Sequence, residues 1–195
     1  MNKRDKKIFE LVDNYLKTYC EHEDMMRIRF ESKKHLFTKD NGEYNWDAHN
    51  YLANQQFYLR LQVQKALQSL NYSRVGIIRF LDKLEECFYR VLYHEIHYSD
   101  YEGEKYNPGW SECYDKLINP IKCELFEKEA DLVYLLSKVK KKDWLTFEEI
   151  KRQLDNDEIS MYSLEELTAL DKQEHRKLID WKKIREQRIK EERRE

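Results

Sequence analysis

Two amphipathic helices joined by a short break account for residues 52–91, which read LANQQFYLRLQVQKALQSLNYSRVGIIRFLDKLEECFYRV. Mostly apolar side chains recur there at alternating steps of four and three residues, which is the spacing of one helical face. Because the break between the helices is so short, we expect them to pack antiparallel, as neighbours in a bundle. The positions on the two faces are Leu52, Gln56, Leu59, Val63, Ala66 and Leu70, and, after Asn71-Tyr72-Ser73, Ile77, Leu81, Leu84, Phe88 and Val91.

Helical spacing extends on both sides of this pair. It predicts a first helix over residues 3–20, Asn45 as the N-cap of the second helix, and a loop over residues 99–109. A short helix over residues 110–118 is expected to end before Asn119-Pro120, where a new helix begins. The apolar face expected for that new helix consists of Cys123, Phe126, Ala130, Val133 and Leu136.

Two capping boxes mark later helix starts, at Thr146-x-x-Glu149 and Ser163-x-x-Glu166. The fold expected from all these patterns is all-α, an antiparallel helical bundle of about seven helices. Residues 1–142 form the bundle, and residues 143–195 form a C-terminal helical appendage with a charged, solvated tail from residue 182 onward.

One stretch, residues 28–44, fits more than one local structure. Arg27-Ile28-Arg29-Phe30 alternates between polar and apolar side chains, and Asp40-Asn41-Gly42 is a turn signal. A small β-hairpin near residues 28–44 is compatible with this pattern, and a loop or an irregular helix fits it equally.

Composition excludes several classes of protein. The 195 residues carry 36 Lys and Arg against 38 Asp and Glu, so the net charge of −2 favours neither a nucleic-acid binder nor an acidic mimic. The chain contains no Gly-x-Gly-x-x-Gly, P-loop or Gly-x-Ser-x-Gly motif. No segment approaches the ~18 apolar residues of a membrane span, so we expect a cytoplasmic protein without a membrane partner. Abundant Lys, Asn, Ile, Tyr and Phe indicate an AT-rich genome of the phage or mobile-element kind.

An aromatic cluster is the first candidate site for binding a partner protein. It spans a predicted helix end and the following loop, and Tyr and Trp bury a large area at low entropy cost while keeping a polar group. The alternative is that these rings only cover the end of the bundle. The cluster consists of Tyr89, Tyr93, Tyr98, Tyr101, Tyr106 and Trp110.

Basic residues form the second candidate site, for nucleic acid or an acidic partner. The acidic segment 143–170 precedes the basic tail, so the tail of one copy could pair with the acidic segment of another and give a homodimer. The alternative is that both segments are ordinary exposed helix faces. The basic residues are Lys138, Lys140, Lys141, Lys142, Lys182, Lys183, Arg185 and Arg188.

His94 and His97 are the weakest candidates, as metal ligands. They are i, i+3 neighbours on a helix, and Cys87 lies seven residues earlier on nearly the same side. The strong zinc spacings, His-Glu-x-x-His and Cys-x-x-Cys, are missing. We therefore expect a structural histidine pair, buried and inert thiols, no metal and no cofactor.

The function expected from these features is that of a non-enzymatic interaction or regulatory protein. It would dock on a protein or nucleoprotein complex through aromatic and charged helix faces, and a role as an inhibitor fits. A nucleic-acid-binding regulator that uses residues 138–142 and the tail is the second hypothesis. A metal-dependent enzyme centred on His94 and His97 is the third.

Overall fold

The computed structural model describes residues 3–28, 39, 41–100, 108–156 and 163–194, and, within these, not the side chains of 3–5, 20–28, 92–100, 108–115 and 117. The described chain is all-α, as the sequence predicts, with seven α-helices and no strand. The helices are α1 (Lys3–Ile28), α2 (Trp46–Gln68), α3 (Arg74–Asp100), α4 (Pro108–Lys138), α5 (Phe147–Asp155), α6 (Leu164–Gln173) and α7 (Trp181–Glu192), with a short 3-10 helix η3 (Lys141–Asp143) after α4.

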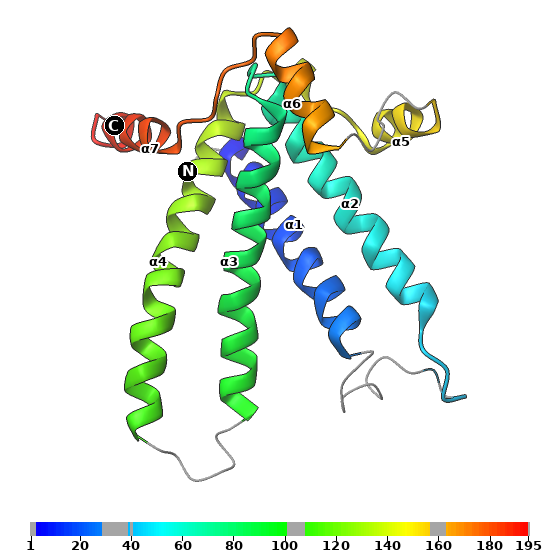
Figure 1. Ribbon diagram of the computed structural model, residues 1–195, viewed down its shortest axis with the longest axis vertical. Helices are drawn as coiled ribbons and strands as arrows, with labels where there is room; N and C mark the ends of the chain where they lie inside the picture. The colour runs from blue at the N-terminus through cyan, green and yellow to red at the C-terminus, as the bar shows by residue number, and fades with distance from the viewer. Residues whose placement is uncertain (1–2, 29–38, 40, 101–107, 157–162, 195) are drawn as a thin grey trace.

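The four long helices form two pairs, α1 with α2 and α3 with α4 (Figure 1). The pairs pack on each other near the start of α1 and diverge toward the other end of the molecule. The three short helices gather at the end where the pairs meet: α5 contacts α2, α6 contacts α3, and α7 contacts α4. None of the helices in the described ranges is both long and apolar enough to cross a bilayer.

The core confirms the stripes expected for α2 and α3. Val63 and Ala66 of α2 and Ile77, Leu81 and Leu84 of α3 are all buried. They join buried residues of α1 and α4 in one cluster, because the short break lets the second helix fold back on the first. The turn is tight enough that Asn71 adopts the left-handed conformation, with φ of 64°. Members from the other helices include Ile8, Val12, Tyr15, Leu16, Leu125, Leu132, Leu136 and Val139.

A buried polar network ties α1, α2 and α3 together beside this cluster. The Tyr15 hydroxyl donates a hydrogen bond to Glu85, and Arg60 Nη1 donates to the other Glu85 oxygen at 2.8 Å and also pairs with Asp82. Burial and the Glu85 carboxylate raise the pKa of Tyr15 well above its ordinary value. The three groups satisfy one another inside the bundle, which indicates a structural role.

Two expectations for α4 are wrong. The helix does not restart at Asn119-Pro120 but runs through it, with Pro120 inside. Ile118 and Leu125, on either side of the proline, are both buried, so packing holds the helix together across the missing N–H. The predicted face of the helix is also partly wrong: Leu136 is buried as expected, but Cys123 is exposed and Phe126 is 65% exposed, because Ile118, Leu125 and Leu132 are buried in their place.

The helix starts at Asn45, Thr146 and Ser163 are confirmed. Asn45 accepts from Ala48 N, and both capping boxes are complete, with reciprocal bonds to Glu149 and Glu166. The first helix extends past residue 20 to Ile28. The proposed hairpin falls largely on residues 29–38 and 40, outside the described chain, and stays a prediction.

The C-terminal region differs from the expected appendage with a solvated tail. α6 ends at Gln173, and residues 174–180 cross the α2–α3 turn, where Ser73 N donates to Lys177 O at 2.6 Å and Lys177 N to Asn71 O at 2.9 Å. α7 then packs on α4 with Ile184 and Arg188 buried. The tail is therefore part of the packed structure, and the boundary at residue 142 stays a prediction.

Candidate functional site

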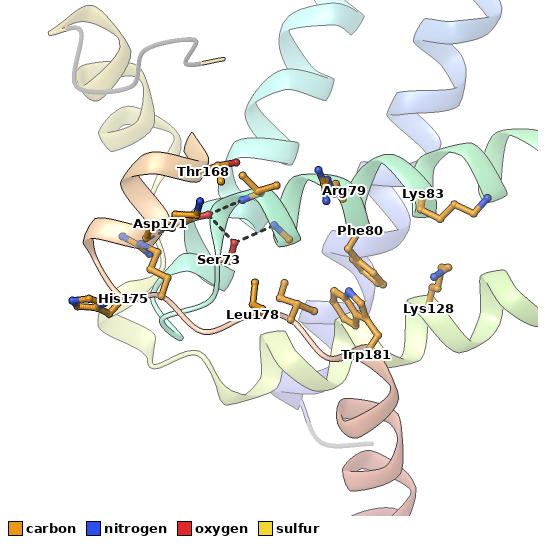
Figure 2. A pocket seen from close by; sticks show the side chains of 15 residues that line it. Ser73, Arg79, Phe80, Lys83, Lys128, Thr168, Asp171, His175, Leu178 and Trp181 are labelled. Atoms are coloured by element: carbon orange, nitrogen blue, oxygen red, sulfur yellow. Dashed lines mark hydrogen bonds and ion pairs between the residues drawn. The ribbon is translucent and has the colours of Figure 1, made fainter. Parts of the chain in front are cut away.

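A hollow of about 980 Å³ lies between α3, α4, α6 and the start of α7, and we call it the basic groove (Figure 2). Residues from the middle of the chain and from its C-terminal part line it, because residues 174–180 pass over the start of α3. Its polar and small lining residues are Ser73, Gly76, Thr168, Asp171 and His175, its apolar ones Val75, Phe80, Leu178, Ile179 and Trp181, and its basic ones Arg79, Lys83, Lys128, Lys172 and Arg176.

Asp171 builds one wall of the groove by capping α3 from outside. Its Oδ2 accepts from the Ser73 hydroxyl at 2.7 Å and from Val75 N at 3.0 Å, and Figure 2 shows these bonds. Burial favours the protonated acid, but hydrogen bonds from Arg74 N, Ser73 and Val75 N outweigh it and hold the pKa of Asp171 below its ordinary value. The carboxylate therefore fixes α6 against the first turn of α3.

The floor of the groove is apolar. The rings of Trp181 and Phe80 stack with centroids 3.3 Å apart and planes 19° apart. A Cβ at Gly76 would lie 3.5 Å from Ile179, an ordinary van der Waals distance, so residues 174–180 pack directly on α3 at this point. Beside this floor, the side chain of Leu178 is 82% exposed. An apolar ligand group would find both a stacked aromatic pair and an exposed leucine here.

The cations of the groove outnumber its acids. Arg176 is neutralised by Asp171 and Glu174. Lys83 from α3 and Lys128 from α4 flank one end of the groove and pair only with acids of their own helices, at 3.3 and 3.6 Å (Figure 2). Among the described residues, nothing lies within ion-pair or hydrogen-bond distance of the Arg79 and Lys172 side chains, and both are exposed. The groove therefore carries positive charge that no acid in the described part of the chain neutralises.

Of the predicted aromatic cluster, the side chain of Tyr89 alone lies in the described part of the chain. Tyr89 is buried, with 8% of its surface exposed, and so does not offer a ring to a partner. Tyr101 and Tyr106 lie outside the described residues, as do the side chains of Tyr93, Tyr98 and Trp110. A docking patch at this place stays a prediction.

The lysines predicted to bind nucleic acid or an acidic partner fall into two groups: some pair with acids of this chain, and the others have no partner among the described residues. Lys138 donates to Glu191 at 2.7 Å and lies 4.5 Å above the Tyr134 ring, and Lys183 pairs with Asp180 at 3.2 Å. The hydrogen bond from Lys138 makes the largest contribution to lowering the pKa of Glu191, which falls to about 2. The remaining lysines are exposed and have no partner among the described residues: Lys140, Lys141, Lys142 and Lys182.

Arg185 and Arg188 meet their acidic partner within the chain. Arg185 Nη2 and Arg188 Nε donate to the two oxygens of Asp131, which is fully buried, at 2.9 Å each. Arg188 also bonds Glu127 at 2.7 Å and Glu192 at 3.1 Å. Two guanidinium groups of the predicted nucleic-acid surface are thus used to hold α7 on α4.

The metal hypothesis finds no support in the described residues. Cys87 is buried, and burial raises the pKa of its thiol, which makes it inert. The side chains of His94 and His97 lie outside the description. No group of three or more His, Cys, Asp or Glu in the described ranges could hold a metal ion.

The groove itself was not found from the sequence. Ser73 and Asp171 are 98 residues apart, and no local pattern links them. The sequence held one signal of this site: the apolar residues Leu178, Ile179 and Trp181 come just before the charged tail. Asp180, among them, caps α7 by accepting from Lys183 N at 3.2 Å. No family model, curated protein or solved structure matches the chain.

Proposed function

We propose that the protein is a non-enzymatic interaction protein whose basic groove binds an acidic, partly apolar segment of a partner protein. The observation that carries the proposal is the combination, in one groove, of two cations without a counter-ion among the described residues and an exposed apolar side chain, Leu178, beside the apolar floor. Acidic side chains of the partner would pair with Arg79 and Lys172, and an apolar side chain between them would contact Leu178 and Trp181. A regulatory or inhibitory role, and a phage or mobile-element origin, stay predictions.

Nucleic acid is the second candidate for the same groove, and the lining favours it less. Single strands bind along a track of cations with exposed aromatic faces on which bases stack. Here the Trp181 ring is already stacked on Phe80, and Phe80 itself is buried. The exposed apolar group is the aliphatic Leu178. These features suit the side chains of a peptide better than bases.

A selection from a random peptide display library tests the proposal, because it needs no knowledge of the partner. The wild-type protein should enrich peptides that combine Asp or Glu with large apolar residues. The variant Arg79→Glu with Lys172→Glu should lose that enrichment, since it reverses the two unpaired charges. The matched control, Lys141→Glu with Lys151→Glu, changes the net charge equally at exposed sites outside the groove and should select the same peptides as wild type.

Two results would overturn the proposal. One is a selection in which the groove variant and the wild type enrich the same peptides. The other is a selection without acidic peptides, while a single-stranded oligonucleotide binds with steep salt dependence that the groove variant abolishes. That second result would mean that the groove binds nucleic acid instead of a peptide.

A further inference from the structure

An uncharged, aromatic surface lies on α2, away from the basic groove. In a chain that is 38% charged, residues 48–59 read AHNYLANQQFYL and contain no Asp, Glu, Lys or Arg. Figure 1 shows α2 at the edge of the molecule opposite α7. The side chain of Tyr51 is 63% exposed and that of Phe57 is 39% exposed, and Asn50 and Asn54 are exposed beside them. We call Asn50, Tyr51, Asn54 and Phe57 the α2 face.

The aromatic surface continues onto α5. The rings of Tyr58 and Phe147 lie with centroids 4.2 Å apart, and Phe147 is 44% exposed. Gln62 of α2 donates to Leu145 O at 3.1 Å, which fixes the start of α5 beside α2. Depletion of charge with enrichment of aromatic residues is the composition that marks the core of a protein interface.

The charges at both ends of the α2 face are already neutralised within the chain. At one end Asp47 pairs with Lys39 at 2.9 Å. At the other end Arg60 pairs with Glu85 at 2.8 Å and also with Asp82. The α2 face itself therefore carries no charged side chain, and the charged side chains Asp47 and Arg60 at its two ends are both in ion pairs.

We infer that the α2 face is a self-association surface that binds the same face of a second copy of this chain. A two-fold interface places a surface against itself, so any net charge on it would meet its own sign. The α2 face avoids that repulsion. Asn side chains carry both donors and acceptors, so Asn50 and Asn54 can bond their own counterparts. An antiparallel contact centred on Asn54 brings Tyr51 against Phe57 of the second copy.

The exposed Phe126 on α4 shows what an ordinary surface ring looks like in this protein. It is 65% exposed, as much as Tyr51, but Glu124, Glu127 and Lys128 surround it in sequence. Single exposed apolar residues among charges are normal on soluble proteins. The α2 face differs because no charged residue lies in sequence between its two rings and its polar groups are uncharged.

Sedimentation of the full chain across about 1 μM to about 1 mM measures the association. The wild type should pass from monomer to dimer in this range. Tyr51→Lys with Phe57→Lys should stay monomeric, because both faces of the contact then repel. Phe126→Lys should associate like the wild type, and circular dichroism melts report whether each variant is folded.

Mixing two oppositely charged variants separates self-association from a general loss of stability. Tyr51→Lys with Phe57→Lys, and Tyr51→Glu with Phe57→Glu, should each be monomeric alone and should form a one-to-one complex when mixed. A wild type that stays monomeric at every concentration would overturn the inference. So would a dimer that the α2-face variants leave intact, since the contact would then lie elsewhere.

Discussion

Asp171 joins α6 to the first turn of α3 through one carboxylate, so its loss should loosen the wall of the basic groove. Asp171→Ala removes the bonds to Ser73 and Val75 N, and losing an N-cap costs about 0.5–2 kcal/mol in the free energy of unfolding. Urea unfolding at neutral pH measures this cost. Asp155→Ala, at an exposed site, should change stability by less than about 0.5 kcal/mol. Equal losses in the free energy of unfolding from the two substitutions would contradict the role of Asp171 as a cap of α3.

Asp131 is the second residue on which the arrangement depends, because two arginines of α7 converge on it. Asp131→Asn removes the fully buried acid among the three that pair with Arg188 and leaves Glu127 and Glu192, and removing one partner of a buried pair costs about 3–5 kcal/mol. Since Arg185 reaches solvent, we expect a loss of about 3 kcal/mol, together with faster tryptic cleavage inside α7. Glu192→Gln, at an exposed partner of Arg188, is the control and should change little. An Asp131→Asn protein with wild-type stability and cleavage would show that α7 is not held there.

Among the elements, α4 carries a proline in its interior and should gain stability when it is replaced. Pro120→Ala restores a backbone N–H and removes the clash of the ring with the preceding turn, worth about 3 kcal/mol in a helix interior. Without the proline, the unfolded chain gains conformational entropy, and this offsets about 0.4–1 kcal/mol of that gain in stability. We expect a net stabilisation of about 2 kcal/mol in thermal or urea unfolding. A destabilised Pro120→Ala protein would mean that the proline ring itself is needed for packing.

The elements also show what the sequence could predict. The stripes of α2 and α3 and the caps at Asn45, Thr146 and Ser163 depend on spacing within one helix, and they were predicted correctly. The face of α4 was misplaced because Cys123 and Phe126 satisfy the same period as the true core residues. The tail was interpreted as solvated because its charges find partners only in space, at Asp131 and Glu127.

The basic groove could not be predicted for the same physical reason. Arg79 and Lys172 are distant in sequence, and each alone reads as an ordinary exposed cation on a helix. They become a site only because Asp171 and the backbone pairing of Ser73 with Lys177 bring α6 onto α3. Helix spacing predicts the elements, while this site depends on contacts between them.

The whole molecule should lose stability in acid. In the described part, the pKa values of Glu149, Asp171, Glu174, Asp180 and Glu191 lie below their ordinary values, and that of Glu191 falls to about 2. A carboxyl with a lowered pKa stabilises the fold above its unfolded pKa and loses that effect as the pH falls through its folded pKa. Glu129 acts in the opposite direction, because burial raises its pKa and its protonation favours the fold.

Because five carboxyls have a lowered pKa and only Glu129 among those described has a raised one, the midpoint of urea unfolding should fall as the pH is lowered from about 4.5 to about 2. It should stay nearly level from about pH 5 to about pH 7. Urea unfolding at a series of pH values, at constant salt, measures this profile. A midpoint that rises or stays level below about pH 4.5 would contradict the ion pairs described for α6 and α7.

The binding of one acidic peptide, taken from the display selection and labelled for fluorescence anisotropy, tests the central claim most directly. Arg79→Glu with Lys172→Glu should weaken its binding at least about tenfold, or about 1.4 kcal/mol. Lys141→Glu with Lys151→Glu should leave its binding unchanged. The same peptide with its acidic residues replaced by Lys should bind the groove variant and not the wild type. Equal binding of the acidic peptide by the wild type and the groove variant would contradict the claim that the basic groove is the docking site.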